Sequence, residues 1–116
     1  MRNRLRVTSE RTGSGVHVHR LAGDLFGDSE GYSFQEQACG EIDGGATKIV
    51  LDLAGVIRLD SAGIGVLASI ANAMREAGGK LVLAALPDRV EKTLGIVMFL
   101  DVVERSATVE DALARL

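Results

Sequence analysis

The fold is decided by residues 49–86, which read IVLDLAGVIRLDSAGIGVLASIANAMREAGGKLVLAAL. The apolar run over residues 48–53 has the composition of a strand that is buried on both faces. The next apolar stretch, residues 62–77, is rich in alanine and is followed by two glycines, which commonly end helices. A second apolar run over residues 80–86 predicts another strand. This strand–helix–strand order predicts a parallel pair joined by a right-handed crossover.

The rest of the chain extends the same pattern in both directions. Apolar and polar residues alternate over residues 5–10 and 16–22, on either side of a glycine-containing turn, which predicts an antiparallel hairpin. The glycines in residues 23–27 are expected to break the second of these strands. Over residues 28–45, apolar residues recur at four-residue spacing, which favours one amphipathic helix.

The C-terminal segment alternates in the same way. Pro87 is expected to open a helix, Val102-Val103 to form a short strand, and a capping box at Thr108–Asp111 to begin a last helix that ends at Leu116. The sequence therefore predicts a single α/β domain over residues 1–116. We expect a four- to five-stranded mixed sheet with about four helices, mostly on one face.

Composition excludes several classes of function. The chain has 116 residues, 47% of them hydrophobic and 25% charged, which is typical of one soluble globular domain. Its net charge of −3 provides no basic field for a phosphate backbone, so we expect no nucleic-acid partner. No apolar run approaches the ~20 residues that span a bilayer, and no secretory signal is evident. We expect a cytoplasmic protein without a membrane partner.

Two kinds of metal-ligating residue occur. Cys39 is the single cysteine, so neither an intrachain disulfide nor a cysteine-based metal cluster can form. His17 and His19 stand two residues apart, which places both on one face of a strand. No third ligand is evident nearby, and the polar face of an alternating strand is the favoured interpretation. We therefore expect neither a metal nor a cofactor.

The pair Asp60-Ser61 stands where the strand gives way to the helix. A serine there can cap the helix, act as a nucleophile or accept a phosphate. Catalysis has little support, because the segment lacks the first glycine of a nucleophile elbow and both histidines lie on an early strand. Neither a P-loop nor a complete dinucleotide fingerprint is present. We expect no catalytic residue.

The helix that follows Ser61 is expected to carry a docking face. Gly63 and Gly65 each cost up to roughly 1 kcal/mol relative to alanine inside a helix, and bare backbone lets another surface approach closely. A merely solvated face would more often carry lysine and glutamate. The polar stripe is instead small and weakly charged: Gly65, Ser69, Asn72 and Glu76. We expect Ser61 both to cap the helix and to lie at this face.

The strand, the Asp-Ser-x-Gly-Ile-Gly motif and the helix that ends in Gly-Gly resemble the central block of the STAS family, the anti-sigma-factor-antagonist domain of bacteria. The resemblance covers nearly the whole chain, up to residues 110–113, and implies a STAS-like fold. The family's Gly-Glu-Leu-Asp motif corresponds here to Gly23-Asp24-Leu25-Phe26. The acidic second position is kept as Asp24, whereas Phe26 replaces the final aspartate.

The resemblance implies that Ser61 is a phosphorylation site. The implied partners are an anti-sigma factor whose kinase fold uses ATP and a phosphatase that resets the switch. Unphosphorylated, the domain would bind the anti-sigma factor and free a sigma factor; phosphorylated, it would release its partner. The expected partner-binding residues are Asp24, Asp60, Ser61, Ala62, Gly63, Gly65, Ser69 and Asn72.

Two alternatives stand beside this interpretation. The first is a STAS adaptor that is never phosphorylated, in a lipid-transport or stress-signalling complex, where Asp60-Ser61 would be a plain helix cap. The second is a small hydrolase that uses Ser61 and a histidine. The edge strand over residues 5–10 also offers a surface for weak self-association as a homodimer.

Overall fold

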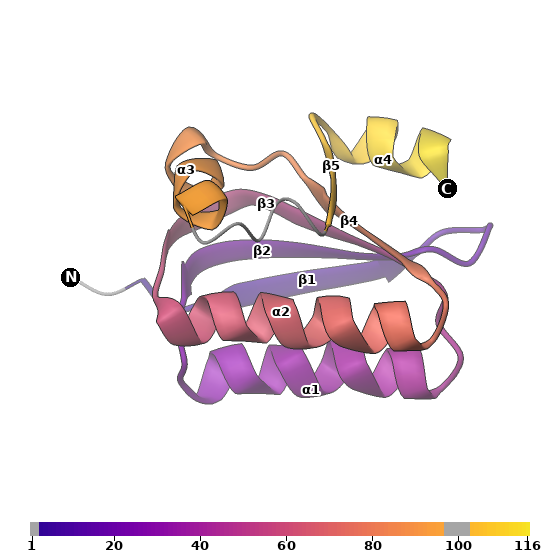
Figure 1. Cartoon of the computed structure of the whole chain (residues 1–116), viewed down its shortest axis with the longest axis horizontal. Helices are drawn as coiled ribbons and strands as arrows, with labels where there is room; N and C mark the ends of the chain where they lie inside the picture. Colours follow the sequence, from indigo (N-terminus) through magenta and orange to yellow (C-terminus); the bar gives the residue numbers. More distant parts are fainter. Residues whose placement is uncertain (1–2, 97–102) are drawn as a thin grey trace.

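The computed structural model describes residues 3–96 and 103–116 as a five-stranded sheet covered by helices (Figure 1). The strands lie in the order β1-β2-β3-β4-β5; β1 pairs with β2 antiparallel and the other neighbours pair parallel. The expected mixed sheet and opening hairpin are confirmed. The elements are β1 (Arg6–Arg11), β2 (His17–Leu25), α1 (Ser29–Asp43), β3 (Lys48–Leu59), α2 (Ser61–Glu76), β4 (Lys80–Ala84), α3 (Asp88–Ile96), β5 (Glu104–Ser106) and α4 (Val109–Arg115).

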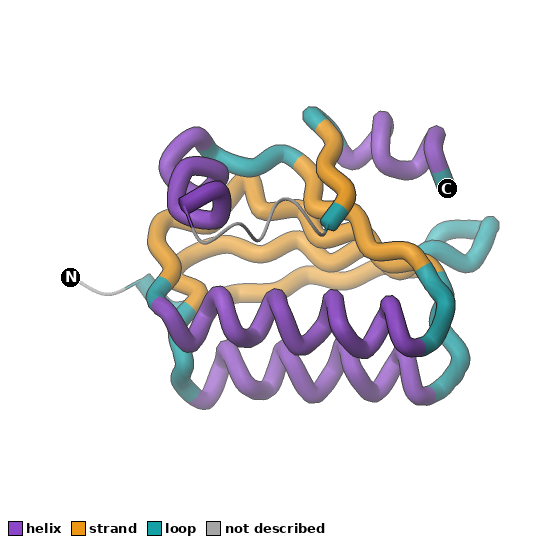
Figure 2. The backbone as a smooth tube through the Cα atoms, in the orientation of Figure 1, coloured by secondary structure: helices purple, strands orange, loops and turns teal. Residues whose placement is uncertain are grey.

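The sheet separates two cores of unequal size. The long helices α1 and α2 lie side by side on one face (Figures 1 and 2). Ile49, Leu51 and Leu53 of β3 belong to the larger core with the buried residues of these helices and of α3, whereas Val50 belongs to a smaller core with α4. Three of the four helices thus contribute to one core. Among the described residues, no helix has the length and apolar character needed to cross a membrane.

Strand β3 is longer than the sequence predicted. The apolar run ends at Leu53, but the strand continues to Leu59. Its pairing with β2 shifts register between Asp52 and Gly55, where an irregularity accommodates the polar and small residues. A Cβ at Gly55 would lie 2.9 Å from the Cβ of Ala22, so glycine permits the close approach. As a result, β3 leads directly into Asp60 and α2.

Strand β2 also extends beyond its predicted end. It passes through Gly23, which was expected to break it, and ends at Leu25. Gly23 adopts a φ of 104°, and its bare backbone lies against the carbonyl group of Arg4. The expected breaking glycine is therefore part of β2 and packs against the segment that precedes β1.

The last strand is displaced from its predicted position. Val102 lies outside the described residues, and Val103 is not in a strand. The strand that pairs with β4 is Glu104–Ser106. Two of its three residues are exposed, so no apolar pattern marks it in the sequence. Strand β4 ends at Ala84 rather than at the predicted residue 86.

Candidate functional site

The start of α2 is capped by Asp60. Its backbone is extended, its Oδ1 accepts a hydrogen bond from the Gly63 N–H at 2.7 Å, and its carbonyl oxygen accepts one from the Ile64 N–H at 3.0 Å. Ser61 is the first residue of the helix. The prediction that Ser61 caps the helix is therefore wrong, because the Asp60 carboxylate accepts the N–H hydrogen bond that a capping side chain accepts.

The Ser61 side chain is available for modification. The residue is exposed, and its hydroxyl has no hydrogen-bond partner within residues 3–96 and 103–116. Backbone N–H groups in the first turn of a helix carry a partial positive charge, which favours a negative group at this position. The structure thus presents an exposed serine at the first residue of α2.

The two glycines of the motif have different roles. Gly63 is buried, and a Cβ there would collide with the carbonyl oxygen of Leu25 at the end of β2. Gly63 is therefore needed for close packing of α2 against β2, and its expected role as a partner-binding residue stays a prediction. Gly65 is exposed, with nothing within 4 Å of the position that a Cβ would take.

Ser61 and Gly65 belong to a continuous surface along α2. Asn72 is also exposed and Ser69 is half-buried. We call these four residues the α2 face. It carries no large apolar side chain and no charge, in agreement with the predicted stripe; the exposed Glu76 follows at its C-terminal end.

The α2 face is bordered by an aromatic residue that the sequence interpretation missed. A Cβ on Gly27 would contact Ala62 and would lie 2.9 Å from the Tyr32 hydroxyl oxygen. Tyr32 is 50% exposed, and aromatic residues with a polar tip are enriched at protein interfaces. The signal was present, because Tyr32 is the one tyrosine of the chain and falls outside the buried stripe of α1.

Asp24 does not belong to the exposed surface. Its side chain is fully buried, and Oδ2 accepts hydrogen bonds from the Asn3 N–H at 2.8 Å and from Arg58 Nη2 at 2.7 Å. The predicted partner-binding role of Asp24 stays a prediction, because the structure shows its carboxylate only in contacts within the chain. Its role is to hold the N-terminal segment and Arg58 in place.

Arg58 is a second residue that the sequence interpretation missed. Its side chain is 44% exposed, and its guanidinium carbon lies 5.5 Å from the centroid of the Phe26 ring. The hydrogen bond and the charge of Asp24 raise the pKa of Arg58 above its usual value. It was missed because the strand was predicted to end at Leu53, five residues before it. Arg58 places a fixed positive charge two residues before Asp60.

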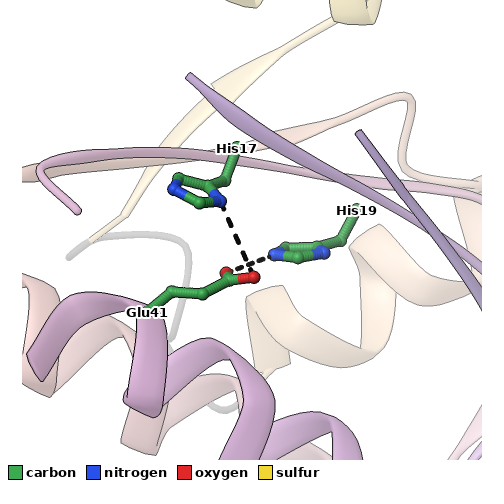
Figure 3. Close-up of side chains that lie close together, drawn as sticks. All are labelled: His17, His19 and Glu41. Carbon is green, nitrogen blue, oxygen red and sulfur yellow. Dashed lines mark hydrogen bonds and ion pairs between the residues drawn. The ribbon is translucent and has the colours of Figure 1, made fainter. Parts of the chain in front are cut away.

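Both histidines lie away from Ser61. His17 and His19 converge on Glu41, near the C-terminal end of α1 (Figure 3). Helices α1 and α2 begin at the same end of the molecule (Figure 1), so the histidines lie toward the opposite end from Ser61. This separation argues against a Ser–His catalytic pair.

Comparisons with known proteins match almost the full length of the chain. No match was found among curated proteins. The chain is similar to an anti-sigma factor antagonist from Mycobacterium paratuberculosis, with a TM-score of 0.82, 18% identity and coverage of 97% of this chain and 93% of that chain. It is also similar to the anti-sigma factor antagonist SpoIIAA of Bacillus. For the unphosphorylated form the TM-score is 0.76 and the identity 21%, with 95% of this chain and 96% of that chain covered. For the phosphorylated form the TM-score is 0.76 and the identity 20%, with 95% of this chain and 98% of that chain covered.

These solved structures establish the shared fold, and the sequence itself identifies the family. The family model of the STAS domain matches residues 9–112, which begin within β1 and end within α4. Because this match covers most of the sequence, the chain belongs to the STAS domain family.

Proposed function

We propose that this STAS domain is a cytoplasmic anti-sigma factor antagonist controlled by phosphorylation of Ser61. When unphosphorylated, it binds an anti-sigma factor that has serine kinase activity, and a sigma factor is freed. When Ser61 carries a phosphate, the partner is released, and a phosphatase resets the domain. The observation that carries the proposal is the exposed Ser61 hydroxyl, without a hydrogen-bond partner in the described chain, at the start of the uncharged α2 face.

The α2 face supports close docking of a partner. Gly65 leaves the helix backbone uncovered, and the side chains of Ser69 and Asn72 are short and neutral. Tyr32 at the border can supply apolar contact area while its hydroxyl stays hydrated. Beyond the capping Asp60, a partner therefore meets no charge on the α2 face until Ser61 is modified.

Phosphorylation changes the charge of this surface at one position. A phosphate adds about −1.5 to −2 charge at pH 7, which the start of α2 can accommodate. Acidic groups of a partner would be repelled: two unit charges ~4 Å apart at an effective dielectric constant of ~20 interact by ~4 kcal/mol. A loss of ~3 kcal/mol weakens binding more than about a hundredfold. One phosphate is sufficient for release.

The comparison with SpoIIAA supports a local switch. The chain matches the unphosphorylated and phosphorylated forms of SpoIIAA with the same TM-score, 0.76. A phosphate is therefore compatible with this fold in SpoIIAA. We propose that Ser61 acts in the same manner, through charge at the docking surface and without refolding of the domain.

Mass spectrometry after incubation with the cognate kinase and ATP tests the proposal. We expect one phosphate on Ser61, its loss in Ser61→Ala, and full phosphorylation of Ser29→Ala. Ser29 is the matched control, because it is the exposed first residue of α1 as Ser61 is of α2. An active kinase that leaves Ser61 unmodified would instead favour the non-phosphorylated STAS adaptor.

A further inference from the structure

We infer that His17, His19 and Glu41 form a binding site for one divalent transition-metal ion such as zinc. The two histidines project from the same face of β2, and Glu41 faces them from α1 (Figure 3). The candidate ligand atoms all lie within 4.8 Å of one another. Two imidazoles and a carboxylate are a ligand set that zinc and its neighbours accept, with water at the fourth position.

The distances are close to those that a tetrahedral ion needs. His19 Nε2 lies 2.7 Å from Glu41 Oε1, and His17 Nδ1 lies 3.6 Å from Glu41 Oε2. Ligands bound at about 2.0–2.2 Å in a tetrahedron stand roughly 3.3–3.6 Å apart. Opening the His19–Glu41 pair by less than about 1 Å would give this spacing at that pair, and the long Glu41 side chain can make that movement. All three candidate ligand atoms already lie within 4.8 Å of one another.

The surroundings of His19 orient its Nε2 toward the cluster. His19 Nδ1 lies 2.7 Å from the hydroxyl oxygen of Ser9, and Gln37 Nε2 donates a hydrogen bond to the same oxygen at 3.2 Å. A serine oxygen can accept from both groups, so once an ion displaces the proton that Nε2 shares with Glu41, Nδ1 can carry the proton and the Nε2 lone pair of His19 can bind the ion. Metal-binding histidines usually have such a partner on their second nitrogen. The Phe34 ring packs edge-on to the imidazole, with centroids 5.5 Å apart.

Charge in this cluster also favours a cation. One carboxylate faces two imidazoles, and only His19 is within hydrogen-bond distance of it. A divalent ion uses two neutral imidazoles and the carboxylate as donors.

The cluster is accessible from solvent on one side. His19 is fully buried, whereas the side chains of His17 and Glu41 are 18% and 21% exposed. An ion can therefore enter, and a water molecule can reach the fourth position. Once bound, the ion would link β2 to the C-terminal end of α1 and so stabilise the folded chain. This site lies away from Ser61, and its existence does not depend on the proposed switch.

Calorimetric titration of tag-free, chelator-treated protein with Zn²⁺ tests this inference. We expect one ion per chain. His17→Ala and Glu41→Gln should each weaken binding at least about tenfold, and Ser9→Ala about 10- to 100-fold. Two controls on α1 should bind as wild type: Glu36→Gln, an exposed carboxylate outside the cluster, and Cys39→Ser, which removes the one thiol.

Two spectroscopic measurements keep the test independent of folding defects. The chain has two histidines, both in the cluster, so both imidazole NMR signals of the wild-type protein should shift with Zn²⁺. Co²⁺ should give the visible absorption of a tetrahedral site in wild type and Glu36→Gln but not in Glu41→Gln. Absence of saturable binding up to about 1 mM Zn²⁺ would overturn the inference. So would wild-type affinity in both His17→Ala and Glu41→Gln.

Discussion

The two long helices begin with nearly the same four residues. Helix α1 starts within Asp28-Ser29-Glu30-Gly31, and α2 within Asp60-Ser61-Ala62-Gly63. In each, the aspartate carboxylate accepts a hydrogen bond from the glycine N–H, at 2.9 Å and 2.7 Å respectively. In each, a Cβ on the glycine would collide with a backbone carbonyl oxygen, that of Phe26 or of Leu25. The cap and the glycine are therefore structural devices, used twice.

The difference lies in the residue after the serine. The Ser29 hydroxyl donates a hydrogen bond to Glu30 at 2.9 Å, and Glu30 also pairs with Arg4. Beside Ser61 stands Ala62, and the Ser61 hydroxyl has no partner among the described residues. Both helix starts have a capping aspartate, but the residue after the serine is acidic in α1, where the hydroxyl is engaged, and neutral in α2. The neighbouring residue, rather than the cap, distinguishes the candidate functional serine.

The largest expected effect tests the buried glycine that the two helix starts share. Gly31→Ala and Gly63→Ala should each lower the free energy of unfolding by about 3 kcal/mol, because each Cβ would meet a backbone carbonyl that cannot move alone. Urea denaturation measures this effect. A large loss in one variant and none in the other would show that the two helix starts are not equivalent.

The next effect tests the difference between the two serines. Ser61→Asp should weaken binding of the anti-sigma factor at least about tenfold, a change of about 1.4 kcal/mol, because it places a charge on the α2 face. Ser29→Asp, beside a residue that is already acidic, should bind like wild type. Ser61→Ala should bind constitutively. Titration calorimetry would contradict the account if Ser61→Asp and Ser29→Asp behaved alike.

Loss of either N-cap aspartate should destabilise the domain less than the glycine substitutions do, and by the same amount at both helices. Asp28→Ala and Asp60→Ala should each reduce the free energy of unfolding by about 1 kcal/mol, because one N–H of the first turn loses its acceptor. The same urea series measures both. A negligible cost at Asp60 alone would indicate that another group caps α2.

The smallest effect separates stability from docking. Gly65→Ala should stabilise the domain by up to about 1 kcal/mol, because the site is open and alanine favours helix. The added methyl group stands on the α2 face, so affinity for the anti-sigma factor should fall a few-fold. Unchanged affinity together with higher stability would remove Gly65 from the docking surface.

The sequence predicted the local features of this molecule. Apolar runs identified β3, α2 and β4, and alternation identified the opening hairpin, because these signals depend on neighbours in the chain. The position of Ser61 at the start of α2 followed from the same local pattern. The extension of β3 to Leu59 did not, because Ala54-Gly55 has the composition of a break and becomes a strand only when paired with β2.

Most of the missed features depend on contacts distant in sequence. Gly63 has its role because Leu25 lies against it, and Asp24 is occupied by Arg58, which is 34 residues away in the chain. Glu41 joins His19 across 22 residues, so no local spacing could reveal the third member of that cluster. The sequence pattern indicates which face of α2 is polar. It does not indicate which residues are covered by other parts of the fold.

The most direct measurement compares phosphoserine installed at position 61 with phosphoserine installed at position 29. Each protein, and the unmodified chain, is titrated with the anti-sigma factor, and thermal unfolding confirms that all three are folded. The account predicts that phosphate at position 61 weakens binding more than about a hundredfold, while phosphate at position 29 leaves affinity within about threefold of the unmodified chain. Equal loss at both positions, or no loss at position 61, would contradict it.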